Sequence, residues 1–176
     1  LPGGHSLTFD LGTRELKVWK YWDFVIEPFD TIPANPEQEW GERLVELLSA
    51  AVKRRLMSDV PLGFFLSGGV DSSVVVALMA RLSGSPVRTF SIGFDEEAFN
   101  ELPYAQQAAD LCGAMHHPEV IAGDVQNLLP VIARHYGEPY ADSSAVPSFH
   151  VSRIARQHVP VVLNGDGGDE LLGGYG

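Results

Sequence analysis

The chain has 176 residues, 45% of them hydrophobic, which is enough for one core of ordinary domain size. Its 12 Lys and Arg residues stand against 23 Asp and Glu residues, and the formal charge of −11 argues against nonspecific nucleic-acid binding. The longest apolar runs, such as 74–80, are too short to span a bilayer, so we expect a soluble cytoplasmic protein that binds no membrane. Cys112 is the only cysteine and lies in an apolar helical pattern, typical of a buried small hydrophobe.

The first third of the chain predicts a hairpin, a connector and a helix. Strand-like segments at 6–10 and 15–21, joined across 11–14, are typical of a β-hairpin. A proline-rich connector at 28–36 marks a domain boundary. A helix then begins at Asn35 and Pro36, and we expect one of its faces to pack on a sheet. The apolar positions of that face are Trp40, Leu44, Leu47, Leu48, Ala51, Val52 and Leu56.

From Val60 onwards, strand and helix patterns alternate. Alternation of this kind predicts an α/β fold, a doubly wound parallel sheet with helices on both faces, preceded here by the short N-terminal β-hairpin. The expected strands are 61–66, 87–93, 116–121 and 159–163, and the expected helices are 71–83, 102–112, about 124–136 and 145–157.

A small-residue turn separates an apolar strand from an apolar helix between residues 60 and 80. Gly68 and Gly69 allow a sharp turn that brings backbone N–H groups close to an anion, and the start of the following helix favours negative charge. No lysine follows the glycines, so the motif is not that of a mononucleotide triphosphatase, and Asp71 instead indicates a bound magnesium ion. A plain turn with a helix cap is the alternative.

A second glycine-rich segment, 164–174, follows the last predicted strand and carries three acids among five glycines. This composition predicts an irregular loop rather than a packed element, and a solvated turn is the alternative to a functional role. Ligands bind beyond the carboxyl ends of parallel strands, so we expect 67–72 and 164–170 to be adjacent at that edge. Asp71 and Asp169 could then hold one magnesium ion together with phosphate oxygens.

Two further groups of polar residues have open roles. His116 and His117 lie in a predicted strand, where neighbouring side chains point to opposite faces, so they cannot easily share a metal ion. Glu138 and Asp142 precede a helix and could bind a substrate ammonium group, although capping by Asp142 and a turn at Pro139 explain them equally well.

The segment from Ser67 to Ser72 resembles the pyrophosphate loop of the adenylating ATP pyrophosphatases, which cleave ATP between the α- and β-phosphates. From about Trp40 to Tyr175 the chain resembles the synthetase domain of glutamine-dependent asparagine synthetases, a family within that superfamily. The resemblance implies a sheet of the adenine nucleotide alpha hydrolase type. It is carried by the segments 60–73, 89–94, 138–144 and 164–175.

The resemblance implies ATP and Mg²⁺ as cofactors, with roles carried over position by position. Five residues match the loop that grips the β- and γ-phosphates, namely Ser67, Gly68, Gly69, Asp71 and Ser72. Four others match the surroundings of the adenosine: Phe65 and Ile92 along the adenine and ribose, and Asn164 and Gly165 at the end of the last strand.

The same matching implies three catalytic carboxylates. Asp71 and Asp169 match the magnesium ligands. Asp166 takes the place of a glutamate linked to the acyl-adenylate step, and Gly168 takes the place of a serine. A shorter carboxylate changes the reach of the side chain, so the amino-acid substrate stays open.

The reaction implied by the resemblance is amide ligation. A carboxylate, aspartate by the family pattern, is adenylated with release of pyrophosphate, and the acyl-adenylate is attacked by ammonia. A glutaminase domain of the same parent chain would supply that ammonia from glutamine. The alternatives are ring closure by the same adenylation, as in β-lactam synthetases, and a noncatalytic adenine-nucleotide-binding module. A homodimer is an open possibility.

The resemblance also implies a longer parent protein. Residues 1–22 look like the end of the preceding glutaminase domain and its link, 23–39 like a linker, and 40–176 like the N-terminal part of a truncated synthetase domain. The family continues into a helical stretch whose lysine contacts the phosphates. We therefore expect a ligase of the glutamine-hydrolysing asparagine synthetase type in the parent, and an inactive fragment here.

Overall fold

The computed structural model describes residues 1–25, 27–28, 31–96, 100–121, 125–138 and 140–174. The chain divides into two compact units, Leu1–Trp40 and Gly41–Gly176. The predicted helix start at residue 124 and the predicted turn at Pro139 lie outside the described residues. No helix within the described ranges is both long enough and apolar enough to cross a membrane.

The first unit contains the predicted hairpin. Strands β1 (His5–Phe9) and β2 (Leu16–Lys20) pair antiparallel, and the turn between them is organised by Asp10. The Asp10 carboxylate accepts the backbone N–H groups of Gly12 and Thr13, both at 2.8 Å. These bonds stabilise the charged form and hold the pKa of Asp10 below its ordinary value. The hairpin prediction is confirmed, each strand lying within about one residue of its expected bounds.

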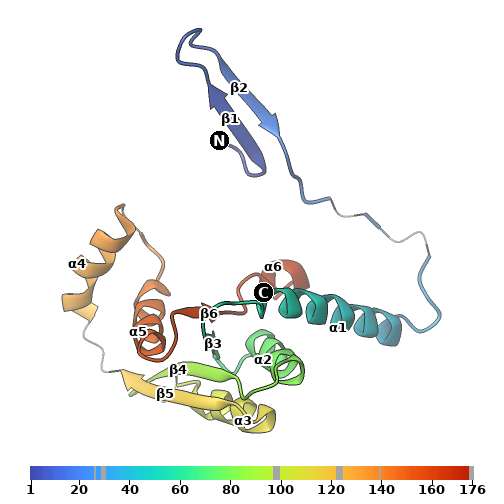
Figure 1. The fold of residues 1–176 in the computed structure, drawn as a ribbon, viewed down its shortest axis with the longest axis vertical. Coiled ribbons are helices and arrows are strands. Elements are labelled where there is room, and N and C mark those ends of the chain that lie inside the picture. Colours follow the sequence, from blue (N-terminus) through green and yellow to red (C-terminus); the bar gives the residue numbers. More distant parts are fainter. Residues whose placement is uncertain (26, 29–30, 97–99, 122–124, 139, 175–176) are drawn as a thin grey trace. The chain divides into compact units, whose positions relative to one another are not determined.

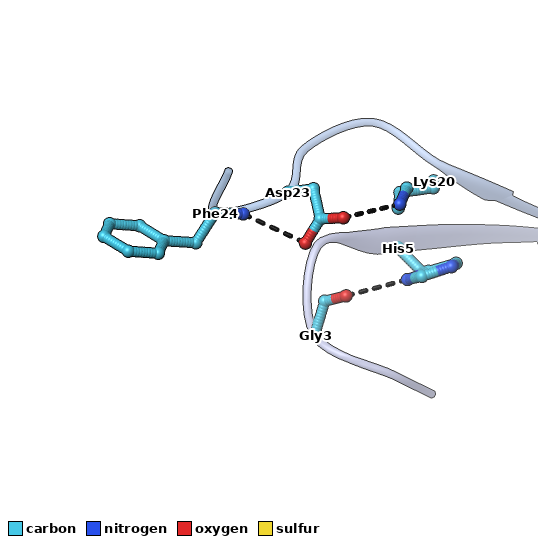
Figure 2. A network of polar contacts seen from close by, with 5 residues as sticks. All are labelled: Gly3, His5, Lys20, Asp23 and Phe24. Atoms are coloured by element: carbon cyan, nitrogen blue, oxygen red, sulfur yellow. Dashed lines mark hydrogen bonds and ion pairs between the residues drawn. The ribbon is translucent and has the colours of Figure 1, made fainter. Parts of the chain in front are cut away.

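Local polar contacts lie on both sides of the open end of the hairpin and are drawn in Figure 2. Lys20 Nζ donates to Asp23 Oδ2 at 2.7 Å, and the other oxygen of Asp23 accepts the Phe24 N–H at 3.0 Å. On the neighbouring strand, His5 Nδ1 donates to the Gly3 carbonyl at 2.7 Å. These exposed contacts fix the path of the chain as it leaves β2, and each contributes little stability by itself.

The second unit is the predicted α/β structure, confirmed as a single four-stranded parallel sheet in the order β5-β4-β3-β6. Helix α1 (Pro36–Arg55) crosses the boundary between the units and leads into it. The elements that follow are β3 (Leu62–Phe65), α2 (Val70–Leu82), β4 (Arg88–Phe94), α3 (Leu102–Cys112), β5 (Met115–Ile121), α4 (Val125–Tyr136), α5 (Ala145–Arg156), β6 (Val161–Leu163) and α6 (Gly168–Leu172).

Helices cover both faces of this sheet (Figure 1). Because side chains alternate along a strand, Phe64 and Leu66 enter a core with α1, α2 and α3, whereas Phe65 flanks the core on the other face. That second core joins Phe90 of β4 to α5. The fully buried Phe64 and Phe90 therefore anchor opposite layers, and the doubly wound arrangement follows from the strand pattern.

The predicted packing of one face of α1 on the sheet is confirmed for only part of that face. Leu48, Val52 and Leu56 contact the core, but Trp40 and Leu47 are 43% and 51% exposed. Helix α1 has 20 residues and is about 30 Å long, whereas the four residues of β3 extend only about 13 Å. The short strands therefore reach only the last turns of the helix.

The prediction of an irregular loop over the whole of 164–174 is also wrong, since residues 168–172 form the short helix α6. Gly167, with φ of +95°, precedes this helix, and Gly173, with φ of +72°, ends it. Asp169 and Glu170 lie in its first turn, where negative charge is favoured by the helix dipole. Glycines that suggested flexibility instead form the two ends of an ordered turn.

The turn between β3 and α2 depends on Gly68. Its φ of +88° is a conformation that other residues rarely adopt, and a Cβ there would lie 2.5 Å from Ala105 N at the start of α3. Gly69 differs, because its φ of −66° suits any residue and its nearest neighbour to a Cβ is Ser67 Oγ at 3.4 Å. Only the first glycine is required by the backbone.

These two glycines give a matched pair of variants. We expect Gly68→Ala to lower the free energy of unfolding by about 2 kcal/mol or more, because it combines a left-handed backbone with a clash against α3. Gly69→Ala should change it by less than about 1 kcal/mol. Urea denaturation of both proteins measures the difference. Equal effects of the two substitutions would contradict this account of the turn.

Candidate functional site

The loops after β3 and β6 meet at the point where the strand order reverses. The chain proceeds from β3 to β4 and β5 on one side, while β6 returns to pair with β3 on the other. A Cβ on Gly165 would lie 3.3 Å from Ser72 N, and one on Gly168 would lie 2.6 Å from Asp71 Oδ2. The expected adjacency of the two loops is confirmed, and it lies where parallel α/β sheets bind ligands.

A cleft of about 760 Å³ opens at this edge of the sheet, a size within the usual range for small-molecule sites. Gly68, Gly69 and Asp169, also predicted for the site, are not among its lining residues. Gly68 packs against the start of α3, and Asp169 lies in α6. The predicted residues that do line the cleft are Phe65, Ser67, Asp71, Ser72, Ile92, Asn164, Gly165 and Asp166.

The first loop is closed by its own hydroxyl groups. Ser72 Oγ donates to the Gly69 carbonyl at 3.1 Å, and Ser67 Oγ lies 3.0 Å from Ser72 Oγ. Because the Ser72 proton is used on Gly69, Ser67 is the donor of that second bond, and its oxygen also accepts the Gly69 N–H at 3.2 Å. Ser72 is buried and Ser67 is exposed, so Ser67 is the hydroxyl that can rotate towards a ligand.

The start of α2 offers unused backbone donors. Gly69 is the N-cap and makes no side-chain capping bond, and the first intrahelical bond runs from Ser73 N to the Gly69 carbonyl. Within the part of the chain that the structure describes, the N–H groups of residues 70–72 have no hydrogen-bond acceptor in the protein. Three such donors at the positive end of a helix can bind an anion.

The second loop is internally ordered as well. Asn164 Nδ2 donates to Asp166 Oδ2 at 2.6 Å, which orients the Asp166 carboxylate, and Gly168 N donates to the Gly165 carbonyl at 3.3 Å. Asn164 and Asp166 are both exposed to the cleft side of the loop. The loop thus presents an oriented carboxylate next to the donors of α2.

The three acids predicted for the site form no ion pair within the described residues. The ion pairs Lys20–Asp23, Arg43–Glu46 and Arg153–Glu119 lie elsewhere in the described part of the chain. None of them involves Asp71, Asp166 or Asp169. The described residues also contain no group of three or more His, Cys, Asp and Glu side chains that could enclose a metal ion by themselves. Any cation here would need ligands from the bound molecule.

The other end of the cleft is apolar. Phe65 at the end of β3 and Ile92 on β4 are partly buried and pack against the core beneath α5. The ends of these strands are held together by Leu66 N, which donates to the Phe90 carbonyl at 3.0 Å, and by Ser91 Oγ, which donates to the Leu66 carbonyl. A flat ring could lie on this surface with its polar tail towards α2.

Sequence reasoning missed part of the cleft wall. Ser144, Pro147 and Ser148 from the start of α5, and Glu101 at the N-cap of α3, also line it. Ser144 ends the segment 138–144 and Ser148 lies in the predicted helix 145–157. Only the packing of α5 over the second face of the sheet brings these two residues to the cleft. No periodicity in the sequence specifies that placement.

Asp142 orders the turn ahead of α5, but it is not the N-cap of that helix, which was its alternative role. Its Oδ1 accepts the Ser144 N–H at 2.8 Å and its Oδ2 accepts the Tyr140 hydroxyl at 3.4 Å. The bonds from Ser144 lower the pKa of Asp142 below its ordinary value. Neither Asp142 nor Glu138 lines the cleft as the structure describes it, and Asp142 forms a turn ahead of the N-cap Ser144.

His116 and His117 lie on opposite faces of β5, as the strand pattern predicts. His116 Nδ1 lies 2.9 Å from Thr89 Oγ1, on the face covered by α3, and burial lowers the pKa of His116. His117 stacks on Phe90 on the other face. The two rings cannot share one metal ion.

The chain was compared with known families and proteins. The asparagine synthase family model matches residues 43–176, which is most of the second unit and both loops of the cleft. A Methanocaldococcus jannaschii protein assigned as asparagine synthetase (glutamine-hydrolyzing) 2 is 41% identical over 177 residues, covering 99% of this chain and 33% of its own length. Bacillus subtilis asparagine synthetase (glutamine-hydrolyzing) 1 is 39% identical over 146 residues, covering 80% of this chain and 23% of its own.

Among solved structures, the NH3-dependent NAD synthetase of Campylobacter jejuni has a similar fold. The TM-score is 0.50 with 19% sequence identity, over 77% of this chain and 60% of that one. The likeness concerns the fold alone. The chain spans between about a quarter and a third of the length of the two curated relatives, and the family match covers both glycine-rich segments. This chain therefore belongs to the asparagine synthase family.

Proposed function

We propose that the chain is the ATP-binding part of an asparagine synthetase-like amide ligase. The observation that carries the proposal is the meeting of two loops at the β3–β6 crevice, one with free helix N-terminal donors and the other with an oriented carboxylate. The reaction is adenylation of a carboxylate, with aspartate as the expected substrate, and release of pyrophosphate. Ammonia then attacks the acyl-adenylate to form the amide.

In this proposal ATP lies along the cleft with its phosphates at α2. The N–H groups of residues 70–72 and the Ser67 hydroxyl donate to the β- and γ-phosphates, and Gly68 and Gly69 let the backbone approach them. The adenine and ribose lie on Phe65 and Ile92, bordered by the backbone of Asn164 and Gly165. Ser67 must exchange its bond to Ser72 for one to phosphate, so binding rearranges the loop without moving the helix.

The acids beside α2 are the groups proposed to hold a magnesium ion. Asp71 is half-buried beside three helix donors, and the position opposite its carboxylate is Gly168, where a Cβ would lie only 2.6 Å from Asp71 Oδ2. We propose that Asp71 and Asp169 hold Mg²⁺ together with phosphate oxygens and water, the ligand set that this ion prefers. When bound, the ion would neutralise charge on the phosphate oxygens.

The chain's own groups would act by position and charge. A carboxylate oxygen is a poor leaving group. Its attack on the α-phosphorus of ATP displaces pyrophosphate and makes the oxygen part of AMP, which is a good leaving group. The donors at α2 stabilise the negative charge that gathers on the departing pyrophosphate, in a site where they are already oriented. No nucleophilic side chain is required for this half of the reaction. Asp166, whose carboxylate accepts a hydrogen bond from Asn164, is proposed to lie near the substrate carboxylate that is adenylated.

The whole protein's organisation is part of the proposal. Residues 1–22 would close a preceding glutaminase domain that supplies ammonia from glutamine, 23–39 would be the linker, and 40–176 would begin the synthetase domain. The support is that curated relatives named as glutamine-hydrolysing are several times longer than this chain. A noncatalytic nucleotide-binding module would keep the cleft but would not release pyrophosphate.

Asp71→Asn tests the magnesium role in the full-length protein. We expect pyrophosphate release to fall by on the order of 10²-fold to 10³-fold, because a phosphate site holds a carboxylate only where a cation bridges the charges. Asp59→Asn, a change of the same kind at an exposed position before β3, should have no effect. Unchanged turnover of Asp71→Asn at limiting magnesium would refute this role.

Asp166 can be tested by two substitutions of different kinds. Asp166→Asn keeps the size of the side chain and removes its charge, and we expect it to bind Mg-ATP but to release pyrophosphate on the order of a hundredfold more slowly. Asp166→Glu keeps the charge and should lose less. A pyrophosphate assay with aspartate and calorimetry with Mg-ATP separate the two steps. Equal loss in both variants would show that the carboxylate charge is not what matters.

A further inference from the structure

Helix α5 connects the nucleotide cleft to a cluster of histidines at the opposite end of the sheet. Its first residues, with Ser144 and Ser148, line the cleft. Its middle, with Val151 and Ile154, packs on Phe90 in the second core. Beyond its last turn, His158 contacts the sheet again. The docking of one helix thus governs both ends.

The far end of this contact is a three-ring stack. The ring centroids of His117 on β5 and His158 are 4.1 Å apart with planes 29° from parallel, and His117 stacks on Phe90 at 5.2 Å. His158 also lies 5.6 Å from Phe90. Stacking of this kind is favourable for neutral imidazoles, whereas two imidazolium rings at this separation repel each other.

The groups around His117 disfavour its protonation. Arg88 on β4 adds positive charge near His117, and among the described residues His117 Nε2 is buried without a hydrogen-bond acceptor for an added proton. Burial, then His158 and Arg88, lower the pKa of His117 below its ordinary value of 6.5. The carboxylate of Glu119 lies on the same face of β5 as His117, and its Oε1 is 4.0 Å from Arg153 Nη2 on α5.

His150, nearer the start of α5, also has a buried ring nitrogen. Its Nδ1 is buried without a hydrogen-bond partner in the described part of the chain. Burial and Arg153 lower the pKa of His150, and Glu119 opposes them only in part. Among the described residues, the groups that these contacts identify at the interface between α5 and the sheet are His117, His150, His158, Arg88 and Arg153, with the acid Glu119 opposing their positive charge.

We infer that this histidine interface is an acid-sensitive latch, which keeps α5 docked at neutral pH and releases it on acidification. Release of α5 withdraws Ser144 and Ser148 from the cleft wall, so the latch couples pH to the shape of the site. The effect on nucleotide affinity rests on the proposed function, but the release of the helix does not.

The direction follows from linkage. A histidine whose pKa is lower in the folded than in the unfolded state binds fewer protons when folded, so its stabilising contribution is complete above pH 6.5 and is lost as pH falls through the folded pKa. For each imidazole that takes up a proton on opening, the equilibrium constant for the opening of α5 rises by up to about tenfold for each unit by which the pH falls. The loss therefore begins just below neutrality.

Amide hydrogen exchange along α5, corrected for the intrinsic exchange rate, measures this opening at about pH 7.5 and about pH 5.5. We expect the equilibrium constant for the opening of residues 145–156 to be larger at the lower pH. His117→Phe keeps a ring on Phe90 without a titrating group and should remove a large part of this dependence. His135→Phe, on the exposed surface of α4, should leave it unchanged. If His117→Phe does not fold, His158→Phe makes the same comparison.

The outcomes are distinct. An opening of α5 that does not change with pH in the unaltered protein, or one that changes equally in His117→Phe, overturns the latch. A change confined to the unaltered protein and His135→Phe supports it. Mg-ATP affinity is then measured at both pH values by calorimetry. No binding at either pH would contradict the proposed function while leaving the exchange result valid.

Discussion

The pairing of β3 with β6 is the contact on which the candidate site depends. The two strands are about a hundred residues apart in the chain, yet they lie in parallel register from Leu62 opposite Val161 to Phe64 opposite Leu163. Their parallel direction puts both following loops at one edge, and their place at the reversal of strand order opens a crevice between them. Without this pairing, Asp71 and Asp166 would not line the same cleft.

Around that contact, helix packing determines how the crevice is finished. Helix α3 presses on Gly68 and fixes the shape of the first loop, while Gly165 and Gly168 let the second loop approach the start of α2. On the other face, α5 brings Ser144 into the wall. A Cβ at Gly165 would lie 3.3 Å from Ser72 N, so glycine at this position keeps a side chain away from one of the α2 donors. The cleft has a polar end, where the α2 donors lie, and an apolar end as the result.

Much of this could be predicted from the sequence. The strand and helix bounds, and the meeting of the two glycine-rich segments, follow from alternation and from the rule that parallel strands share a carboxyl edge. Three features could not. The exposed half of α1 depends on how short the strands are, α6 depends on left-handed glycines at 167 and 173, and the α5 wall depends on tertiary packing. Local pattern carries no information on these.

The most direct test of the account follows backbone amide resonances while Mg-ATP is added to the chain. The account predicts that the amides of 67–72 and of 164–166 shift together, with the same concentration dependence, because one ligand bridges the β3–β6 crevice. Shifts confined to one of these loops, or shifts only at sites away from the cleft, would contradict the claim that the two loops form one nucleotide site.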